Sequence, residues 1–287
     1  MTILGAVFLP QLPPERLRDV ARAADEAGLD ELWLWEDCFR ESGVASAAAA
    51  LAWTQRLRVG VGLLPVPLRN VALTAMEVAT LHRLFPGRVH VGVGHGVQDW
   101  MGQVGARVES PMMLLREYLN ALRSLLRGDE VTVDGRYVHL DGVRLDWPPT
   151  GQVEVYAGAV GPKSLRLCGE LADGTILTGG TTVDGVRAAR ALIKEGGATA
   201  AHRITVYLEA ATGPGATERL RADLATWGSD PAEVGVAGGA AAVAEAVRRW
   251  ADAGADAVIL QPTPDDPDPE GFVRFAAEQV RPELDRT

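Results

Sequence analysis

Residues 57–96 read LRVGVGLLPVPLRNVALTAMEVATLHRLFPGRVHVGVGHG, a pattern of one strand, one helix and a second strand. The apolar runs LRVGVGLLP (57–65) and RVHVGVGHG (88–96) predict the two strands, and residues 70–85 repeat apolar side chains at helical spacing. Apolar runs of this kind are typical of strands that are buried on both faces of a parallel sheet. The segment therefore predicts a parallel α/β protein.

The same alternation continues on both sides of this unit. Six further strands are predicted at residues 3–10, 31–39, 153–158, 174–180, 204–210 and 256–262. Helices are predicted at 14–28, 44–54 and 111–127, from Gly161–Pro162 onward, at 182–195, in two stretches of 215–254, and at 269–284. Eight such units close a barrel, so the predicted fold class is α/β, a (β/α)8 TIM barrel over residues 1–287 as a single domain. The alternating segment 131–140 has Asp-Gly at its centre and predicts an extra hairpin after strand 4.

The composition argues against nucleic acid, metal ions and membranes as binding partners. A formal net charge of −10 argues against nucleic acid, because the phosphates would be repelled. The two cysteines form no CxxC pair and the five histidines form no HExxH motif, so no metal site is expected. The chain has no apolar run of membrane-spanning length, and its first residues read as a strand. We therefore expect a cytoplasmic protein without membrane contact.

Barrel active sites are built from the loops that follow the strands. The corresponding strand ends here are Phe8–Gln11, Glu36–Phe39, Gly62–Pro65, Gly94–Trp100, Gly158–Gly161, Thr178–Thr181, Glu209 and Gln261.

Two of these strand ends have features of an anion site. The first comprises Gly158, Ala159, Val160, Gly161 and Lys163, and the second comprises Thr178, Gly179 and Gly180. Free N–H groups at a helix N-terminus bind anions, and glycine lets an oxyanion approach the backbone. Late barrel loops often hold phosphate in this way, although the same glycines are compatible with simple turns.

Candidate catalytic side chains follow strands two and four. Asp37 is a candidate general acid or partner of a cofactor ring, and the alternative is a helix cap or a surface acid. Cys38 places a thiol beside it, and a free cysteine is also often merely buried. His95, next to Gly94, is a candidate proton donor or a hydrogen-bonded structural histidine. Trp100 either covers a bound ring or packs its own loop.

The order and spacing of these motifs resemble the luciferase-like monooxygenases, the family of bacterial-luciferase-like flavin and deazaflavin oxidoreductases. Residues 57–96 resemble its third strand, Pro-Leu-Arg stretch, Pro-Gly-Arg turn and glycine-containing fourth strand. VEVYAGAVGPKSLRLCGELADGTILTGG (153–180) resembles its phosphate-binding helix start and Ala-Asp-Gly strand. Residues 131–149 and 253–262 also fit the family pattern.

The resemblance implies a cofactor at the carboxyl ends of the strands. Its ring would rest against the end of the third strand, where Gly62–Leu63 matches a non-prolyl cis peptide of relatives that use the deazaflavin coenzyme F420. Gly158–Gly161 and Thr178–Gly180 would hold the phosphate, and Asp37 would contact the side of the ring. Gly94–Trp100 would line the ring and the substrate.

The sequence departs from the family pattern in two places. Cys38 stands where many relatives have a histidine, so His95 or Asp37 would supply any proton. Val97 and Trp100 stand where some sugar-oxidising relatives carry polar catalytic groups, which argues against a glucose-6-phosphate type of substrate.

The resemblance favours an oxidoreductase that transfers a hydride between coenzyme F420 and an organic substrate. We expect a hydrophobic substrate because Phe8, Phe39 and Trp100 stand near the mouth. The alternatives are an FMN-dependent monooxygenase supplied by a separate flavin reductase, a non-catalytic flavin-binding protein, and a sugar-phosphate isomerase. Family habit predicts a homodimer. An entrance for the acidic tail of F420 would be basic, and Arg69, Arg107 and Lys163 are candidates for it, with a solvated surface charge as the alternative for each.

Overall fold

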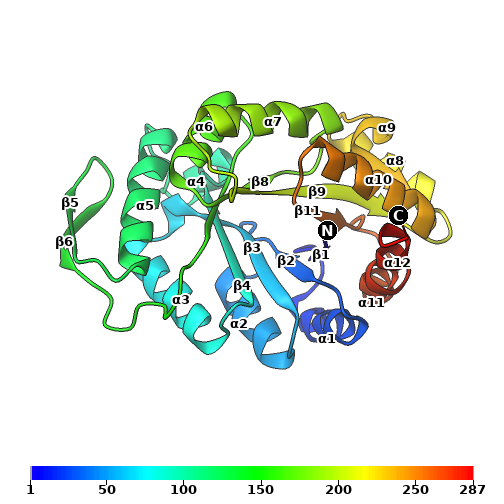
Figure 1. Cartoon of the computed structure of the whole chain (residues 1–287), viewed down its shortest axis with the longest axis horizontal. Coiled ribbons are helices and arrows are strands. Elements are labelled where there is room, and N and C mark those ends of the chain that lie inside the picture. The colour runs from blue at the N-terminus through cyan, green and yellow to red at the C-terminus, as the bar shows by residue number, and fades with distance from the viewer. Residues whose placement is uncertain (1, 287) are drawn as a thin grey trace.

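Eight parallel strands close into a barrel in the computed structural model, which describes residues 2–286 (Figure 1). In order around the barrel they are β1 (Ile3–Phe8), β2 (Glu31–Leu34), β3 (Arg58–Pro65), β4 (Val89–Gly94), β7 (Val155–Gly158), β8 (Gly174–Leu177), β9 (Arg203–Ala211) and β11 (Ala257–Gln261). The ring closes because β8 pairs with β9 and β11 pairs with β1. The predicted (β/α)8 barrel is confirmed.

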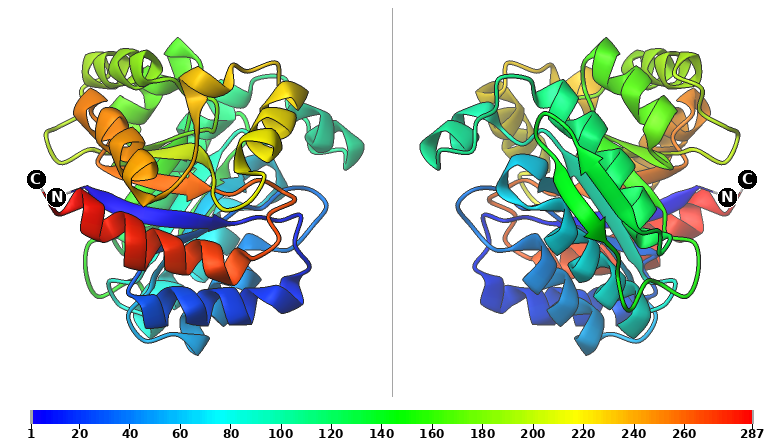
Figure 2. Two further views of the ribbon diagram at one scale, coloured as in Figure 1. Left: turned by 90° about the vertical axis from the view of Figure 1, so that its right-hand side faces the viewer. Right: turned by 90° about the vertical axis from the view of Figure 1, so that its left-hand side faces the viewer.

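Helices surround the barrel on its outside (Figures 1 and 2). The longer ones are α1 (Leu17–Ala27), α2 (Gly43–Trp53), α3 (Val71–Leu84), α5 (Pro111–Leu126), α6 (Pro162–Leu171), α7 (Val183–Glu195), α8 (Ala216–Thr226) and α10 (Ala240–Ala253). The last segment runs through α11 (Pro269–Arg274), the π-helical η3 (Phe275–Val280) and α12 (Arg281–Leu284). Short turns are η1 (Pro14–Arg16), η2 (Val66–Leu68) and α9 (Pro231–Val234). Gly28 ends α1 with φ +81°, in the left-handed conformation that glycine favours.

The predicted hairpin is present as the antiparallel pair β5 (Val131–Asp134) and β6 (His139–Val143), which projects from the side of the barrel (Figure 1). Two short elements were not predicted. Helix α4 (Gln98–Gln103) forms in the loop after β4, where Arg107 donates hydrogen bonds to the Gln98 carbonyl oxygen. Strand β10 (Gly235–Ala237) pairs with the last three residues of β9, because β9 extends beyond its partners in the ring.

Inward-facing glycines make room for large side chains inside the barrel. Trp33 on β2 is fully buried, and a Cβ atom at Gly60 on β3 would lie 2.4 Å from its ring. Tyr156 and Tyr207 meet the Trp33 ring edge-on, with centroids 6.2 and 6.1 Å away. These aromatic side chains fill the middle of the barrel, so a ligand has room only above them, at the carboxyl ends of the strands.

A buried ion cluster closes the amino-terminal end of the barrel. The Glu31 carboxylate accepts hydrogen bonds from Trp33 Nε1 at 2.9 Å and Arg203 Nη2 at 3.3 Å, and His90 Nε2 lies 3.3 Å away. Burial disfavours the charge, but His90, Arg203 and Trp33 outweigh it and lower the pKa of Glu31 to about 2. Because the ordinary value is 4.5, this stabilisation is complete above that pH and is lost as the pH falls toward about 2.

Among the described helices, none has the length and apolar character that crossing a membrane requires. Within residues 2–286, no three His, Cys, Asp or Glu side chains gather in a way that would hold a metal ion.

We expect Glu31→Gln to lower the free energy of unfolding by about 3 kcal/mol at pH 7, because Arg203 and its neighbours lose their buried counter-charge. Denaturant unfolding of both proteins measures the difference. The exposed Glu26 on α1 provides a matched control, and Glu26→Gln should change stability by less than about 0.5 kcal/mol. Equal losses in the two variants would contradict the role of the cluster.

Candidate active site

Leu63 forms the centre of the barrel mouth, and three predicted cofactor residues meet there. The Gly62–Leu63 peptide bond is cis, as the resemblance implied. The Leu63 side chain occupies the space above Gly94 of β4 and Gly158 of β7, where an added Cβ atom would lie 2.5 Å and 2.2 Å from its Cδ2 atom. Any larger residue at Gly94 or Gly158 would displace this side chain. Three neighbouring strands thus present one apolar surface at their carboxyl ends.

The turn at Gly62 is held from inside the barrel. Tyr207 on β9 donates a hydrogen bond from its hydroxyl group to the Gly62 carbonyl oxygen at 3.1 Å. A Cβ atom at Gly62 would lie 2.2 Å from that hydroxyl oxygen, so glycine is required for the contact. The pairing of β3 with β4 is irregular between Val61 and Leu64, which leaves Leu63 outside the ladder. The sequence permits this irregular strand end because Gly62 has no side chain that would collide with Tyr207, and Leu63 can then leave the ladder.

The N-terminus of α6 is open toward the mouth. It begins after Gly161, which has no side chain to cap it, and Pro162 lacks an N–H group. Leu165 N–H is bonded to the Gly161 carbonyl oxygen, so Lys163 and Ser164 carry the first-turn N–H groups that point out of the helix. Oriented N–H groups and the helix dipole favour an anion at this position.

The start of α7 differs from the start of α6. The Thr182 hydroxyl group caps α7 by accepting a hydrogen bond from Gly185 N–H at 3.0 Å. The Thr181 hydroxyl group is likewise engaged, since it donates to the Thr178 carbonyl oxygen at 2.7 Å. Gly180 adopts a left-handed conformation with φ +78°. Of the two predicted anion segments, the one at α6 therefore has the freer donors.

His95 lies beside the open helix. Its Nε2 atom is 3.3 Å from the Ser164 hydroxyl oxygen in the first turn of α6. Burial lowers the pKa of His95, so its imidazole is neutral at pH 7. Trp100 is half-buried on α4. The structure thus brings His95 together with the predicted phosphate segment, and its role in catalysis stays a prediction.

Asp37 and Cys38 follow β2 at the same end of the barrel. Burial raises the pKa of Asp37 despite the opposing charge of Arg40. Burial and the nearby Glu36 and Asp37 carboxylates also raise the pKa of the Cys38 thiol. At neutral pH Cys38 is therefore a thiol and not a nucleophilic thiolate. The catalytic roles of both residues stay predictions.

Glu209 is a further buried acid at the mouth. It lies on β9 two residues after Tyr207, so both side chains point into the barrel. Only 5% of its surface is exposed. Burial raises the pKa of Glu209 to about 7, with a smaller contribution from the Asp223 charge, although a hydrogen bond from Gly180 N–H opposes the shift. The sequence marks Glu209 as a strand end, but its burial follows only from the closed barrel.

The comparison with known proteins identifies the family of the chain. The family described as luciferase-like monooxygenase matches residues 4–266. The chain belongs to the luciferase-like monooxygenase family.

Relatives within and near this family differ in cofactor. The chain is 32% identical over 174 residues to a 5,10-methylenetetrahydromethanopterin reductase of Methanolobus tindarius, a match that covers 60% of this chain and 53% of that protein. The chain thus spans about half the length of this curated relative. An F420-dependent secondary alcohol dehydrogenase in complex with an F420-acetone adduct has the same fold, with a TM-score of 0.86, 22% identity and 99% of both chains covered. The oxygenating component of the 3,6-diketocamphane monooxygenase of Pseudomonas putida, in complex with FMN, superposes with a TM-score of 0.80, 17% identity and 99% coverage of both chains.

Two of the three predicted basic rim residues are engaged elsewhere in this luciferase-like barrel. The Arg69 guanidinium group is 13% exposed and binds Glu36 at 2.8 Å and Glu77 at 2.7 Å, so its prediction as a rim residue is wrong. It fixes Glu36, which also accepts a hydrogen bond from Gly43 N–H at the start of α2. Arg107 pairs with Asp99 at 2.9 Å and supports α4. Lys163 is exposed at the open end of α6.

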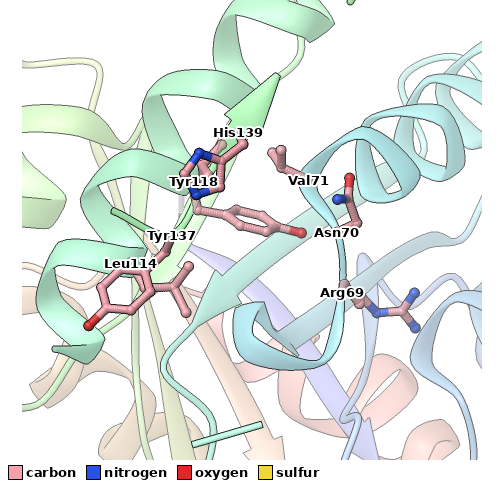
Figure 3. Close-up of a pocket in the computed structure, with 8 residues that line it drawn as sticks. Arg69, Asn70, Val71, Leu114, Tyr118, Tyr137 and His139 are labelled. Carbon is pink, nitrogen blue, oxygen red and sulfur yellow. The ribbon is translucent and has the colours of Figure 1, made fainter. Parts of the chain in front are cut away.

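Two cavities lie outside the mouth. One of about 60 Å³ lies between α3, α5 and the hairpin, where Tyr118, Tyr137 and His139 line it (Figure 3). Another of about 510 Å³ lies among the end of α5, residues 149–153 and Asp173, next to the amino-terminal ends of β7 and β8. Neither contains the residues of the Leu63 surface.

Proposed function

We propose that this chain is an oxidoreductase that binds coenzyme F420 at the barrel mouth and transfers a hydride between it and an organic substrate. One observation carries the proposal: the apolar Leu63 surface, made by three strands, lies at the same end of the barrel as the open N-terminus of α6. A cofactor with a flat ring and a phosphate group needs both features. The F420-dependent fold neighbour supports the choice of cofactor.

The chain's own residues would then bind and orient the cofactor. Leu63, kept in place by Gly94 and Gly158, would support the ring, and the N–H groups of Lys163 and Ser164 would bind the phosphate. When bound, the coenzyme supplies the hydride chemistry, and the protein fixes its position.

The exposed apolar side chains at the rim of the mouth favour a hydrophobic substrate. Phe39, Val97 and Val160 follow β2, β4 and β7, and their side chains are 63%, 48% and 74% exposed. Exposed apolar side chains on three loops around one site favour an apolar ligand and exclude water when it binds.

An FMN-dependent monooxygenase with a separate flavin reductase is the second candidate. FMN has a tricyclic ring and a phosphate group as well, and a neighbour of the same fold holds it. The Leu63 surface and the α6 N-terminus would serve either cofactor, so the two functions differ in which cofactor binds.

Titration of the purified protein with oxidised F420 and, separately, with FMN distinguishes these candidates, with tryptophan fluorescence as the readout. We expect F420 to bind at least about tenfold more tightly than FMN, a difference of about 1.4 kcal/mol. Tighter binding of FMN would replace the proposal with the monooxygenase. Failure of both cofactors to bind would contradict the flavin and deazaflavin functions together.

We also infer that the chain forms a homodimer through α3. Leu73, Met76 and Leu84 are 46%, 58% and 65% exposed and follow one another at helical spacing along this helix. A stripe of exposed apolar side chains on one face is typical of a subunit interface.

Light scattering coupled to gel filtration tests this interface. We expect the wild-type protein to have twice the mass of its 30.5 kDa chain, and Met76→Glu to shift it to the monomer by placing a charge in the interface. A monomeric wild-type protein would contradict the inference. Glu218→Gln, an exposed change on α8, is the control that should leave the mass unchanged.

A further inference from the structure

Two polar side chains stand next to each other at the top of an otherwise apolar barrel interior. Glu209 on β9 and Gln261 on β11 are paired in register, and the residues below them, Tyr207 and Ile259, belong to the inner hydrophobic cluster. Both polar side chains therefore point inward, toward the mouth and not toward the surrounding helices.

The Glu209 and Gln261 side chains both meet the loop that follows β8. A Cβ atom at Gly179 would lie 2.3 Å from Glu209 Oε1 and 3.0 Å from Gln261 Oε1, so both side chains converge on the loop after β8. Among residues 2–286, Glu209 Oε2 is buried and has no hydrogen-bond partner. A buried polar atom without a partner is costly, so its presence at the mouth indicates a position where a ligand atom can pair with it.

We propose that Glu209 is the proton donor of the site, and that the substrate bears a polarised C=O or C=N bond whose heteroatom receives this proton. The inference rests on the proposed function and names its substrate class. Reduction of such a bond adds a hydride to carbon and a proton to oxygen or nitrogen. The hydride and its electron pair come from the reduced coenzyme, the proton comes from the Glu209 carboxyl group, and water returns a proton to the carboxylate.

The surroundings of Glu209 keep its acid form available at neutral pH. Burial is the main cause of its raised pKa, and the Asp223 carboxylate on α8 adds to it. From the loop after β8, Gly180 N–H acts in the opposite direction by favouring the charged form. From β11, the nearest polar group is the uncharged Gln261 amide. A general acid is most effective when its pKa lies near the working pH.

Chemical labelling of the cofactor-free protein tests the proposal. An aryl diazoacetamide esterifies only a protonated carboxyl group: the acid proton moves to the diazo carbon, dinitrogen leaves, and the carboxylate oxygen forms the new C–O bond. Its aryl group also suits an apolar mouth. At pH 7 we expect peptide mass spectrometry to find the ester mainly at Glu209, with a labelling rate that falls about tenfold for each pH unit above the pKa of this group.

Two variants make the result specific. Glu209→Gln should abolish the main label, because the reagent esterifies a carboxyl group and not an amide, while the far-UV circular dichroism spectrum stays that of the wild-type protein. Asp223→Asn should keep the label but move its pH dependence to lower pH, because it removes the negative charge that disfavours ionisation. The Asp223→Asn result keeps the test decisive if Glu209→Gln does not fold.

Two other carboxyl groups near β2 could compete for the reagent, since burial also raises the pKa of Asp37 and of Glu41. Labelling of either in place of Glu209, or no labelling at pH 7, would overturn the proposal. Because no cofactor is present, this outcome is independent of the F420 titration. If the protein is labelled at Glu209 but does not bind F420, the proposed function is overturned. The result would then show only that Glu209 is an accessible protonated acid at the mouth.

Discussion

The space inside the barrel is the constraint on which the rest of the structure depends. Inward-facing glycines on β3, β4 and β7 leave room that Trp33 fills in the middle and Leu63 fills at the mouth. The Trp33 ring blocks the centre of the barrel, and Leu63 turns its end into an apolar surface. Both side chains occupy space that only glycine leaves free. The glycines of three strands therefore determine the shape of the candidate cofactor site.

The two ends of the barrel treat a buried carboxyl group in opposite ways. At the amino-terminal end, Glu31 is surrounded by His90, Arg203 and Trp33, and its pKa falls to about 2. At the carboxyl end, burial raises the pKa of Glu209 to about 7 with a smaller contribution from the Asp223 charge, although backbone N–H groups favour the charged form. The first group is a fixed ion that stabilises the fold, and the second can exchange a proton. The proposed proton donor thus lies at the end at which barrel enzymes carry their active sites.

The sequence predicts the barrel well because the repeating pattern of strand and helix is local. It also places Gly62, Gly94 and Gly158 at strand ends, and the structure brings them to the same Leu63 side chain. The sequence does not reveal the ion pairs of Arg69, because its partners Glu36 and Glu77 approach it only in the folded chain. The sequence does not mark Glu209 as a proton donor, because its buried free oxygen arises from the closure of β8, β9 and β11, which no local pattern reveals.

The F420 affinity of Gly158→Ala tests the central claim that the Leu63 surface supports the cofactor. The new Cβ atom would lie 2.2 Å from Leu63 Cδ2 and would force this side chain out of place. Gly151→Ala is the control, because nothing lies within 4 Å of a Cβ atom there. We predict that Gly158→Ala weakens F420 binding at least about tenfold and that Gly151→Ala leaves it unchanged. Wild-type affinity in a folded Gly158→Ala protein would contradict the account.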